Sequence, residues 1–362
     1  MSPPLLDELA VGQRLVALLS AGRRDSTLRL ACALALLDAA AESGRGSPGP
    51  ALPVSIDALA DRVVELYWRQ TRPYAGGVLL GQGKAAGARL AVLEEVAALA
   101  ADARAGGSET AHQAAVRLPA RYAAARRRIA LTLAQQPLTD LQTPAGLRRG
   151  SVPPFLYDDS WLGRKATQAD LDAHDRAVVL LPGVASALVR LGPLVRPLVE
   201  RSWAEHVARV NRVEALGAVE GFLFGPDVDR LRPLAEPLAD LQGGRCFSCG
   251  GPLGRARVEH FVPWSRFPLD AVANLVAVDE RCAADRDGAL PALSLVFRWH
   301  RRRGLYDRGE LAGWPVEHAR TQAVVLATYA SVAAGLPLWA GRGAYEPAAG
   351  SEGARVRSLL AA

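Results

Sequence analysis

The sequence predicts a mainly helical α+β protein in which one short strand–loop–strand–helix unit is embedded among helices. Apolar residues recur three and four positions apart over most of the chain, which is the spacing of an amphipathic helix. Between Gly243 and Asp279 that spacing gives way to glycine, proline and β-branched residues, which are typical of strands and turns. With 362 residues, half of them apolar and 22% charged, the chain can bury a core in about two or three packing units.

The apolar spacing divides the chain into regions. The N-terminal region, residues 1–135, is expected to form helices over 5–19, 27–41, 56–69, 85–105 and 109–135. Four prolines make residues 136–165 an irregular linker. In the middle region, residues 166–242, helices are expected over 168–176, 182–211, 213–224 and 229–241.

The C-terminal third contains the expected strands. Residues 243–303 are predicted to hold strands over 256–262 and 274–278 and a helix over 283–303. A C-terminal helical region, 304–362, follows, with its last helix over 316–335.

The sequence favours a protein without a membrane segment. Its start lacks the basic stretch and the long apolar core of a signal peptide. Residues 321–341 carry no charge, but Gly335 and Pro337 interrupt them, which favours a buried helix over a membrane span. We therefore expect a cytoplasmic protein with no membrane partner.

Charge favours a polyanionic partner only weakly. The chain has 43 basic and 37 acidic residues, a net charge of +6. All the basic residues except Lys84 and Lys165 are arginines, and alanine is also abundant, so the arginine content reflects a compositional bias. Arginine-rich spots such as Arg148-Arg149 are interpreted as solvated surface.

The residues that predict chemistry lie between Arg245 and Trp299. Glu259 and His260 lie near the end of the first expected strand, and Asn274 begins the second. A neutral imidazole can take a proton from water near pH 7, and a carboxylate can hold a hard cation that stabilises a phosphate. The amide of Asn274 can fix the loop between the strands by hydrogen bonds to its backbone. This pattern predicts metal-assisted hydrolysis of a phosphodiester.

Three of the four cysteines fall in the same segment. Cys246 and Cys249 form a Cys-x-x-Cys pair, and Cys282 follows Asp279 by three residues at the start of a helix. Structural zinc takes four ligands, commonly from two such pairs. Two interpretations remain open: a zinc site of three cysteines and Asp279, or a tight turn at the first pair with Cys282 as a buried packing residue.

Residues 245–299 resemble the HNH endonuclease family, whose fold is the ββα-metal finger. The shared features are the Cys-x-x-Cys knuckle, the acidic-His pair of Glu259-His260 followed by Phe-x-Pro-Trp-Ser, the Asn-Leu-Val strand and a cysteine at the helix start. The flanks are similar to larger bacterial HNH proteins, through a Glu-Leu-Tyr-Trp element at 65–68 and a Trp-x-x-x-Val-x-x-x-Asn helix at 203–211. This second resemblance brings no chemistry with it.

The resemblance implies an endonuclease that acts on DNA and uses one Mg²⁺ or Mn²⁺ ion. His260 corresponds to the base that activates water, Glu259 to the metal-binding acid and Asn274 to the structural asparagine of the family. An embedded HNH finger over residues 243–303 is the fold that it implies.

The chain departs from the family at the second metal ligand. The family has an Asn or a His there, whereas this chain has Ala283, which cannot bind a metal. Asp285 and Asp287 on the same helix are the candidate substitutes. The alternatives to a nuclease are a degenerate module that binds nucleic acid without cleaving it, and a structural protein in which the finger only packs helices together.

Basic residues after the site are candidates for contacts to a phosphate backbone. They are Arg286, at a position where the family usually has lysine, and His300, Arg301 and Arg302. A solvated helix end with cations near its C-terminus is the other interpretation of the last three.

Overall fold

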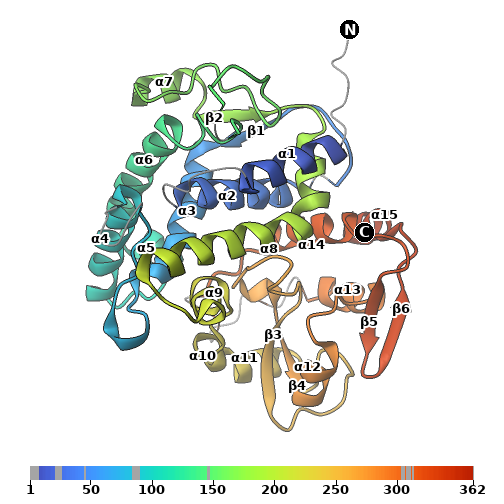
Figure 1. The fold of residues 1–362 in the computed structure, drawn as a ribbon. Coiled ribbons are helices and arrows are strands. Elements are labelled where there is room, and N and C mark those ends of the chain that lie inside the picture. The colour runs from blue at the N-terminus through green and yellow to red at the C-terminus, as the bar shows by residue number, and fades with distance from the viewer. Residues whose placement is uncertain are drawn as a thin grey trace. The chain divides into compact units, whose positions relative to one another are not determined.

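The computed structural model describes residues 8–20, 27–44, 46–83, 90–144, 147–302, 306, 311 and 314–361. Helices dominate it, and three two-stranded sheets accompany them, which confirms the expected α+β class (Figure 1). The chain divides into two compact units: unit 1 is residues 1–40 and 47–225, and unit 2 is residues 41–46 and 226–362. Within the described ranges, no helix is long and apolar enough to cross a membrane.

Unit 1 is built from helices and one short antiparallel sheet. Strand β1 (Leu52–Ser55) pairs with β2 (Ala177–Leu180), and α3 packs against α4 and α6. The helices are α1 (Glu8–Ser20), α2 (Leu28–Glu42, whose last two residues belong to unit 2), α3 (Ile56–Trp68), α4 (Ala91–Ala105), α5 (Ala111–Arg117), α6 (Pro119–Gln135), α7 (Gln168–Ala173), α8 (Val184–Asn211) and α9 (Leu216–Phe224).

Three expected helices of unit 1 differ from the structure. The single helix expected over 109–135 is two helices, because Leu118 leaves the helical conformation and Pro119 begins α6. The helix expected over 168–176 ends at Ala173, and β2 follows it. Of the helix expected over 85–105, residues 85–89 lie outside the described part, and α4 begins at Ala91.

The described residues of 136–165 are irregular, as expected, but they are not a linker. They lie within unit 1, and Phe155, Leu156 and Tyr157 are buried. The side-chain oxygen of Gln142 accepts hydrogen bonds from the backbone N–H groups of Phe155 (2.9 Å) and Leu156 (2.7 Å). Its amide nitrogen donates to the carbonyl of Tyr157 (2.8 Å). This buried glutamine replaces the backbone pairing that a helix or a sheet would supply.

The two elements of the second resemblance meet in the core of unit 1. The rings of Tyr67 and Trp203 lie 5.2 Å apart. The indole of Trp203 donates to the side chain of Gln82 (2.7 Å), and Asn211 exchanges hydrogen bonds with both backbone groups of Gly81 (2.7 and 2.9 Å). These residues fix the segment before residue 84, a structural role.

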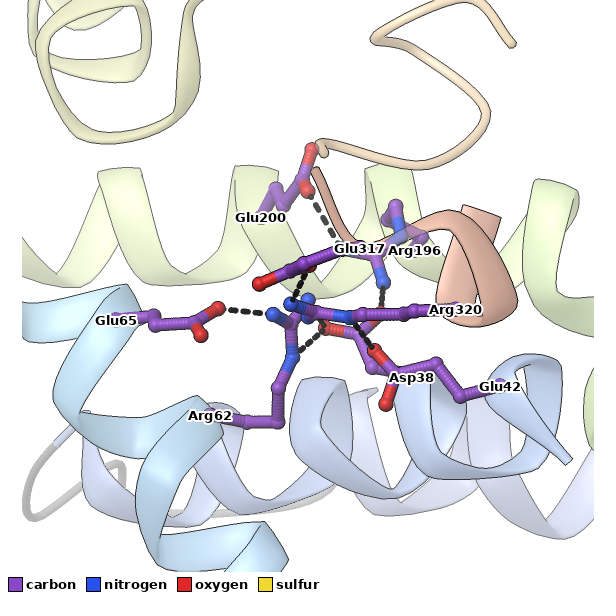
Figure 2. Close-up of polar contacts among 8 residues, drawn as sticks. All are labelled: Asp38, Glu42, Arg62, Glu65, Arg196, Glu200, Glu317 and Arg320. Atoms are coloured by element: carbon purple, nitrogen blue, oxygen red, sulfur yellow. Dashed lines mark hydrogen bonds and ion pairs between the residues drawn. The ribbon is translucent and has the colours of Figure 1, made fainter. Parts of the chain in front are cut away.

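Unit 1 also contains a buried ionic network (Figure 2). Asp38 on α2 is 0% exposed and accepts hydrogen bonds from Arg62 on α3 (2.9 Å) and from Arg196 on α8. Arg62 also pairs with Glu65, and Arg196 with Glu200 (3.3 Å). The three helices are thereby joined by charges that must stay paired, because an unpaired buried ion is costly.

Unit 2 contains the unit expected from the sequence and the C-terminal elements. Strand β3 (Ala256–His260) pairs antiparallel with β4 (Leu275–Asp279), and β5 (Pro337–Gly341) with β6 (Ala344–Pro347). The helices are α10 (Val228–Leu231), α11 (Ala235–Leu241), α12 (Glu280–Arg286), α13 (Leu293–His300), α14 (His318–Ala330) and α15 (Glu352–Ala361). The core forms around Phe261 and Trp299, whose stacked rings lie 5.1 Å apart.

The helices expected in this part are interrupted. The helix expected over 229–241 is α10, a short 3-10 turn and α11. The helix expected over 283–303 is split into α12 and α13, because Asp287 (φ 41°) and Gly288 (φ 74°) reverse the backbone. Residue 303 and most of 304–313 lie outside the described residues. The helix expected over 316–335 ends at Ala330, and the hairpin β5–β6 and α15 follow it.

Candidate functional site

The segment that carries the sequence motifs folds as the expected strand–loop–strand–helix unit. In the register of β3 and β4, His260 lies opposite Leu275, so the loop between them runs from Phe261 to Asn274. Helix α12 begins directly after β4 and contacts both strands. Asp279 is its N-cap, with Oδ1 accepting from the backbone N–H of Arg281 (3.0 Å).

Asn274 fixes the loop that follows His260. The side chain is 0% exposed, and its Oδ1 accepts from the N–H of Val262 (2.8 Å). Its Nδ2 donates to the carbonyls of Leu269 (3.0 Å) and Val262 (3.4 Å). These are the backbone contacts that the sequence predicted for this asparagine.

His260 is buried, and it contacts a carboxylate in the loop between β3 and β4. Its Nε2 lies 2.8 Å from Oδ1 of Asp270, in the loop, and its ring lies 5.0 Å from that of Trp264. The other oxygen of Asp270 accepts from Arg230 of α10 (2.5 Å), whose guanidinium lies over the ring of Trp314. Asp270 therefore fixes the imidazole of His260, and Arg230 fixes the carboxylate of Asp270.

The environment of Asp270 keeps its carboxylate ionised. Burial acts to raise the pKa of Asp270, but the hydrogen bond from His260 and the charge of Arg230 outweigh burial, and the net pKa lies below the ordinary value. No sequence motif pointed to Asp270 or Arg230, which are ten and thirty residues away from His260 in the sequence. The sequence offered one signal for Asp270: it is an acidic residue in the loop that follows His260.

The carboxylates expected to bind Mg²⁺ or Mn²⁺ do not converge on His260. Glu259 precedes it on β3, and successive side chains of a strand point to opposite faces. Asp285 is engaged elsewhere: its Oδ2 accepts from the indole of Trp339 (2.7 Å) and from the N–H of Gly343 (2.8 Å). Asp287 is exposed, beyond the end of α12. Within the described ranges, no group of three metal-ligating side chains includes any of these residues.

Arg286 lies where it stabilises the strand–loop–strand–helix unit, not where it could contact a phosphate. It is 6% exposed and donates to the carbonyls of His260 (2.9 Å), Phe261 (2.5 Å) and Ala289 (2.9 Å). Burial lowers its pKa, while the negative charge of Glu259 acts in the opposite sense. The guanidinium of Arg286 therefore interacts electrostatically with Glu259, the acidic residue that the resemblance assigns to the metal.

The other predicted phosphate contacts are also mostly buried. Arg302 is 6% exposed, donates to the carbonyl of Leu275 (3.2 Å) and lies over the ring of Phe247. His300 is 7% exposed. Arg301 is exposed and lies over the ring of Phe297. Of Arg286, His300, Arg301 and Arg302, only Arg301 remains accessible to a nucleic acid.

The three cysteines meet in one cluster. The sulfur atoms of Cys246, Cys249 and Cys282 all lie within 4.8 Å of one another, a geometry compatible with a metal such as zinc. A tight turn brings the first two together: Gly250 has φ 71°, and its N–H donates to the carbonyl of Cys246 (2.9 Å). Arg298 of α13 holds this turn by donating to the carbonyl of Ser248 (2.7 Å).

The thiol environment fits a cation. Burial acts to raise the pKa of Cys246, but the backbone N–H groups of Asp279, Cys249 and Ser248 directed at its sulfur lower it below the usual value. Burial and the adjacent thiols of Cys249 and Cys246 raise the pKa of Cys282 to about 12. Three thiolates so close together would repel one another. A bound cation would offset that repulsion and stabilise the thiolate form, which is the form that binds metal.

Asp279 does not complete the cluster as the sequence had suggested. Its carboxylate caps α12, and within the described ranges the cluster holds the three cysteines only. Asp279 contributes through its backbone instead, because its N–H donates to the sulfur of Cys246 (3.3 Å).

Comparison with known proteins does not place the chain in a family. No protein-family model, curated protein or solved structure matches it.

Proposed function

We propose that residues 243–303 are an HNH-type ββα finger, stabilised by zinc, that binds nucleic acid without cleaving it. This proposal depends on one observation: the positions expected to supply a second metal ligand either bind other groups or carry no ligand. Asp285 is bound by Trp339 and Gly343, and Ala283 offers no ligand. A hard cation prefers six or more oxygen ligands and here would find one candidate carboxylate, Glu259, near the buried guanidinium of Arg286.

Nucleic-acid binding is supported by the charge of the finger. Residues 243–303 contain ten arginines and six acidic residues, a larger excess per residue than in the whole chain. Arginines with exposed side chains lie on β3, on α12, on α13 and in the segments before β3 and after α13, and they are Arg245, Arg255, Arg257, Arg281, Arg298 and Arg301. Such side chains can contact phosphates without reading bases.

One observation favours the nuclease as a second candidate. The Nε2 contact of His260 with Asp270 resembles the way carboxylates orient a catalytic imidazole, which would leave Nδ1 to take a proton from water. In that case Mg²⁺ or Mn²⁺ would be bound by Glu259, water and the substrate phosphate.

Two measurements on the full-length protein test the proposal. Binding of a short DNA duplex, followed by fluorescence anisotropy, is expected to weaken with salt, with a slope of about −0.9 per phosphate contact. Reversal of two exposed charges, Arg257→Glu with Arg281→Glu, should reduce that slope by about 2. The matched control is Arg148→Glu, an exposed arginine of unit 1, which should leave the slope unchanged.

Plasmid cleavage with Mg²⁺ or Mn²⁺ separates the candidates. The proposal expects no cleavage by the native protein. Cleavage that is lost in His260→Ala would establish the nuclease instead. Absence of DNA binding at low salt would leave only a structural role for the finger.

A further inference from the structure

We infer that the three-cysteine cluster binds a zinc ion with one coordination position open to a ligand from outside the chain. This inference rests on the zinc part of the proposed function and not on nucleic-acid binding. It would make the cluster an exchangeable metal centre, whereas a closed structural site has all four positions filled by protein.

The number of protein donors carries the first step. Zinc in proteins is almost always four-coordinate and tetrahedral, with cysteine sulfur as one of its preferred donors. The described residues bring three sulfur atoms together and no other cysteine, histidine, aspartate or glutamate. Three thiolates provide three of the four bonds.

The second step is the position of Asp279, which the sequence offered as the fourth ligand. Its Oδ1 accepts from the N–H of Arg281 at 3.0 Å, which is the N-cap interaction of α12. Its N–H donates to the sulfur of Cys246 at 3.3 Å, so the residue touches the cluster through its backbone. The backbone contact supports the sulfur of Cys246 as a ligand, while the carboxylate caps α12 and is not one of the grouped ligand atoms.

Exposure supports the third step, access from solvent. Cys246 and Cys282 are 2% and 1% exposed, whereas Cys249 is exposed. External molecules therefore reach the cluster on the Cys249 side. In the free protein the fourth ligand would be water, and a neutral nitrogen donor of the imidazole class would replace it, since imidazole is a preferred zinc ligand and adds no negative charge to three thiolates.

Cobalt substitution in the full-length protein tests the inference. The native protein loaded with Co²⁺ should show the visible spectrum of a tetrahedral site, and titration with imidazole should shift its d–d bands. In Asp279→Cys, which restores a second Cys-x-x-Cys pair, the thiolate-to-cobalt absorption should rise and the response to imidazole should disappear. Zinc release to a chelator should be slower in this variant by about tenfold or more. Removing a residue that only supports a ligand already weakens metal binding by about that factor, and a fourth thiolate should have at least as large an effect.

The control is Asp279→Asn, which keeps an oxygen to cap α12 but removes the charge that a zinc ligand from this residue would need. It should retain the native cobalt spectrum and the native response to imidazole. A changed spectrum in Asp279→Asn, or a native protein that does not respond to imidazole, would show that the chain fills the fourth position and would overturn the inference. A protein that binds neither Co²⁺ nor Zn²⁺ would overturn it together with the zinc part of the proposed function, whereas DNA binding would be judged by its own salt dependence.

Discussion

The carboxylate of Asp270 is shared between His260 and Arg230, and this sharing predicts the effect of removing its charge. Asp270→Asn should destabilise the protein by about 1–3 kcal/mol near neutral pH, since the half-buried guanidinium of Arg230 and the buried imidazole of His260 lose a charged acceptor. Urea unfolding measures the change. Asp287→Asn is the control, because Asp287 is exposed and asparagine tolerates its left-handed backbone.

The same carboxylate predicts a pH dependence. Its pKa in the folded protein lies below the ordinary value, so the unfolded chain binds this proton more tightly. The stabilisation is therefore complete above about pH 4 and is lost as the pH falls through the folded pKa. Between neutral pH and about pH 3, the native protein should lose more unfolding free energy than Asp270→Asn. An equal loss in both proteins would contradict the lowered pKa.

Asp38 provides a second prediction for a single residue. It is fully buried between Arg62 and Arg196 (Figure 2), so Asp38→Asn removes the counter-ion that these two buried cations share. We expect a loss of about 3–5 kcal/mol in unfolding free energy, the scale of a broken buried ion pair. Asp172→Asn, which removes an exposed partner of Arg176, should cost no more than about 1 kcal/mol. Similar losses in the two variants would contradict the role assigned to burial.

At the scale of elements, the loop between β3 and β4 depends on Asn274. Asn274→Ala leaves the buried N–H of Val262 and the carbonyl of Leu269 without partners, at a cost of about 1–3 kcal/mol. Asn274→Asp keeps the oxygen that accepts from the N–H of Val262 but loses the Nδ2 donor. The loop should therefore also become more mobile near Leu269, whose carbonyl loses its hydrogen bond. Thermal unfolding gives the stability, and the amide exchange rate of Val262 reports the loop itself. Unchanged exchange in Asn274→Ala would contradict this account.

The sequence predicted elements best where local pattern and tertiary pairing agree. Strands β3 and β4 are close in sequence and lie in a segment where valines, glycine and proline replace the helical spacing, so their pairing was predictable. Strands β1 and β2 are four residues each and pair across more than a hundred residues, which no local pattern reveals. The apolar run after Ala330 suited a helix by composition, but Gly335 and Pro337 place a turn and a strand there.

Some of the remaining errors were readable from single residues. Pro119 starts α6, and Gly288 and Pro291 separate α12 from α13. The site divides in the same way. The cysteine cluster and the role of Asn274 follow from motif spacing, whereas the partnership of His260 with Asp270 and Arg230 depends on how α10 and the loop pack.

At the scale of the whole molecule, the division into units could not be inferred from composition. The proline-rich stretch 136–165 resembles a linker, yet buried apolar residues and Gln142 bind it into unit 1. The division occurs instead between Gly225 and Pro226, where the sequence shows only an ordinary turn signal. A buried loop and an exposed linker can share one composition, because burial depends on residues elsewhere in the chain.

The proposed zinc site predicts an effect of metal removal that is confined to unit 2. The ion would join the knuckle at Cys246–Cys249 to the start of α12, so its binding free energy would add to the stability of the finger. A ligand present at 1,000 times its dissociation constant adds about 4 kcal/mol to the state that binds it. Chelation should therefore speed amide hydrogen exchange in β3, β4 and α12 and leave the helices of unit 1 unchanged.

Hydrogen exchange with mass spectrometry resolves this by peptide, and Cys249→Ser supplies the matched variant. Loss of one ligand should reproduce the effect of the chelator, and adding chelator to the variant should change little more. Faster exchange throughout both units would mean that the finger does not unfold as a separate part, because the lost free energy would then be shared by every helix. Unchanged exchange everywhere would mean that the cluster adds no metal-dependent stability, and the interpretation of the cysteines as packing residues would then be the correct one.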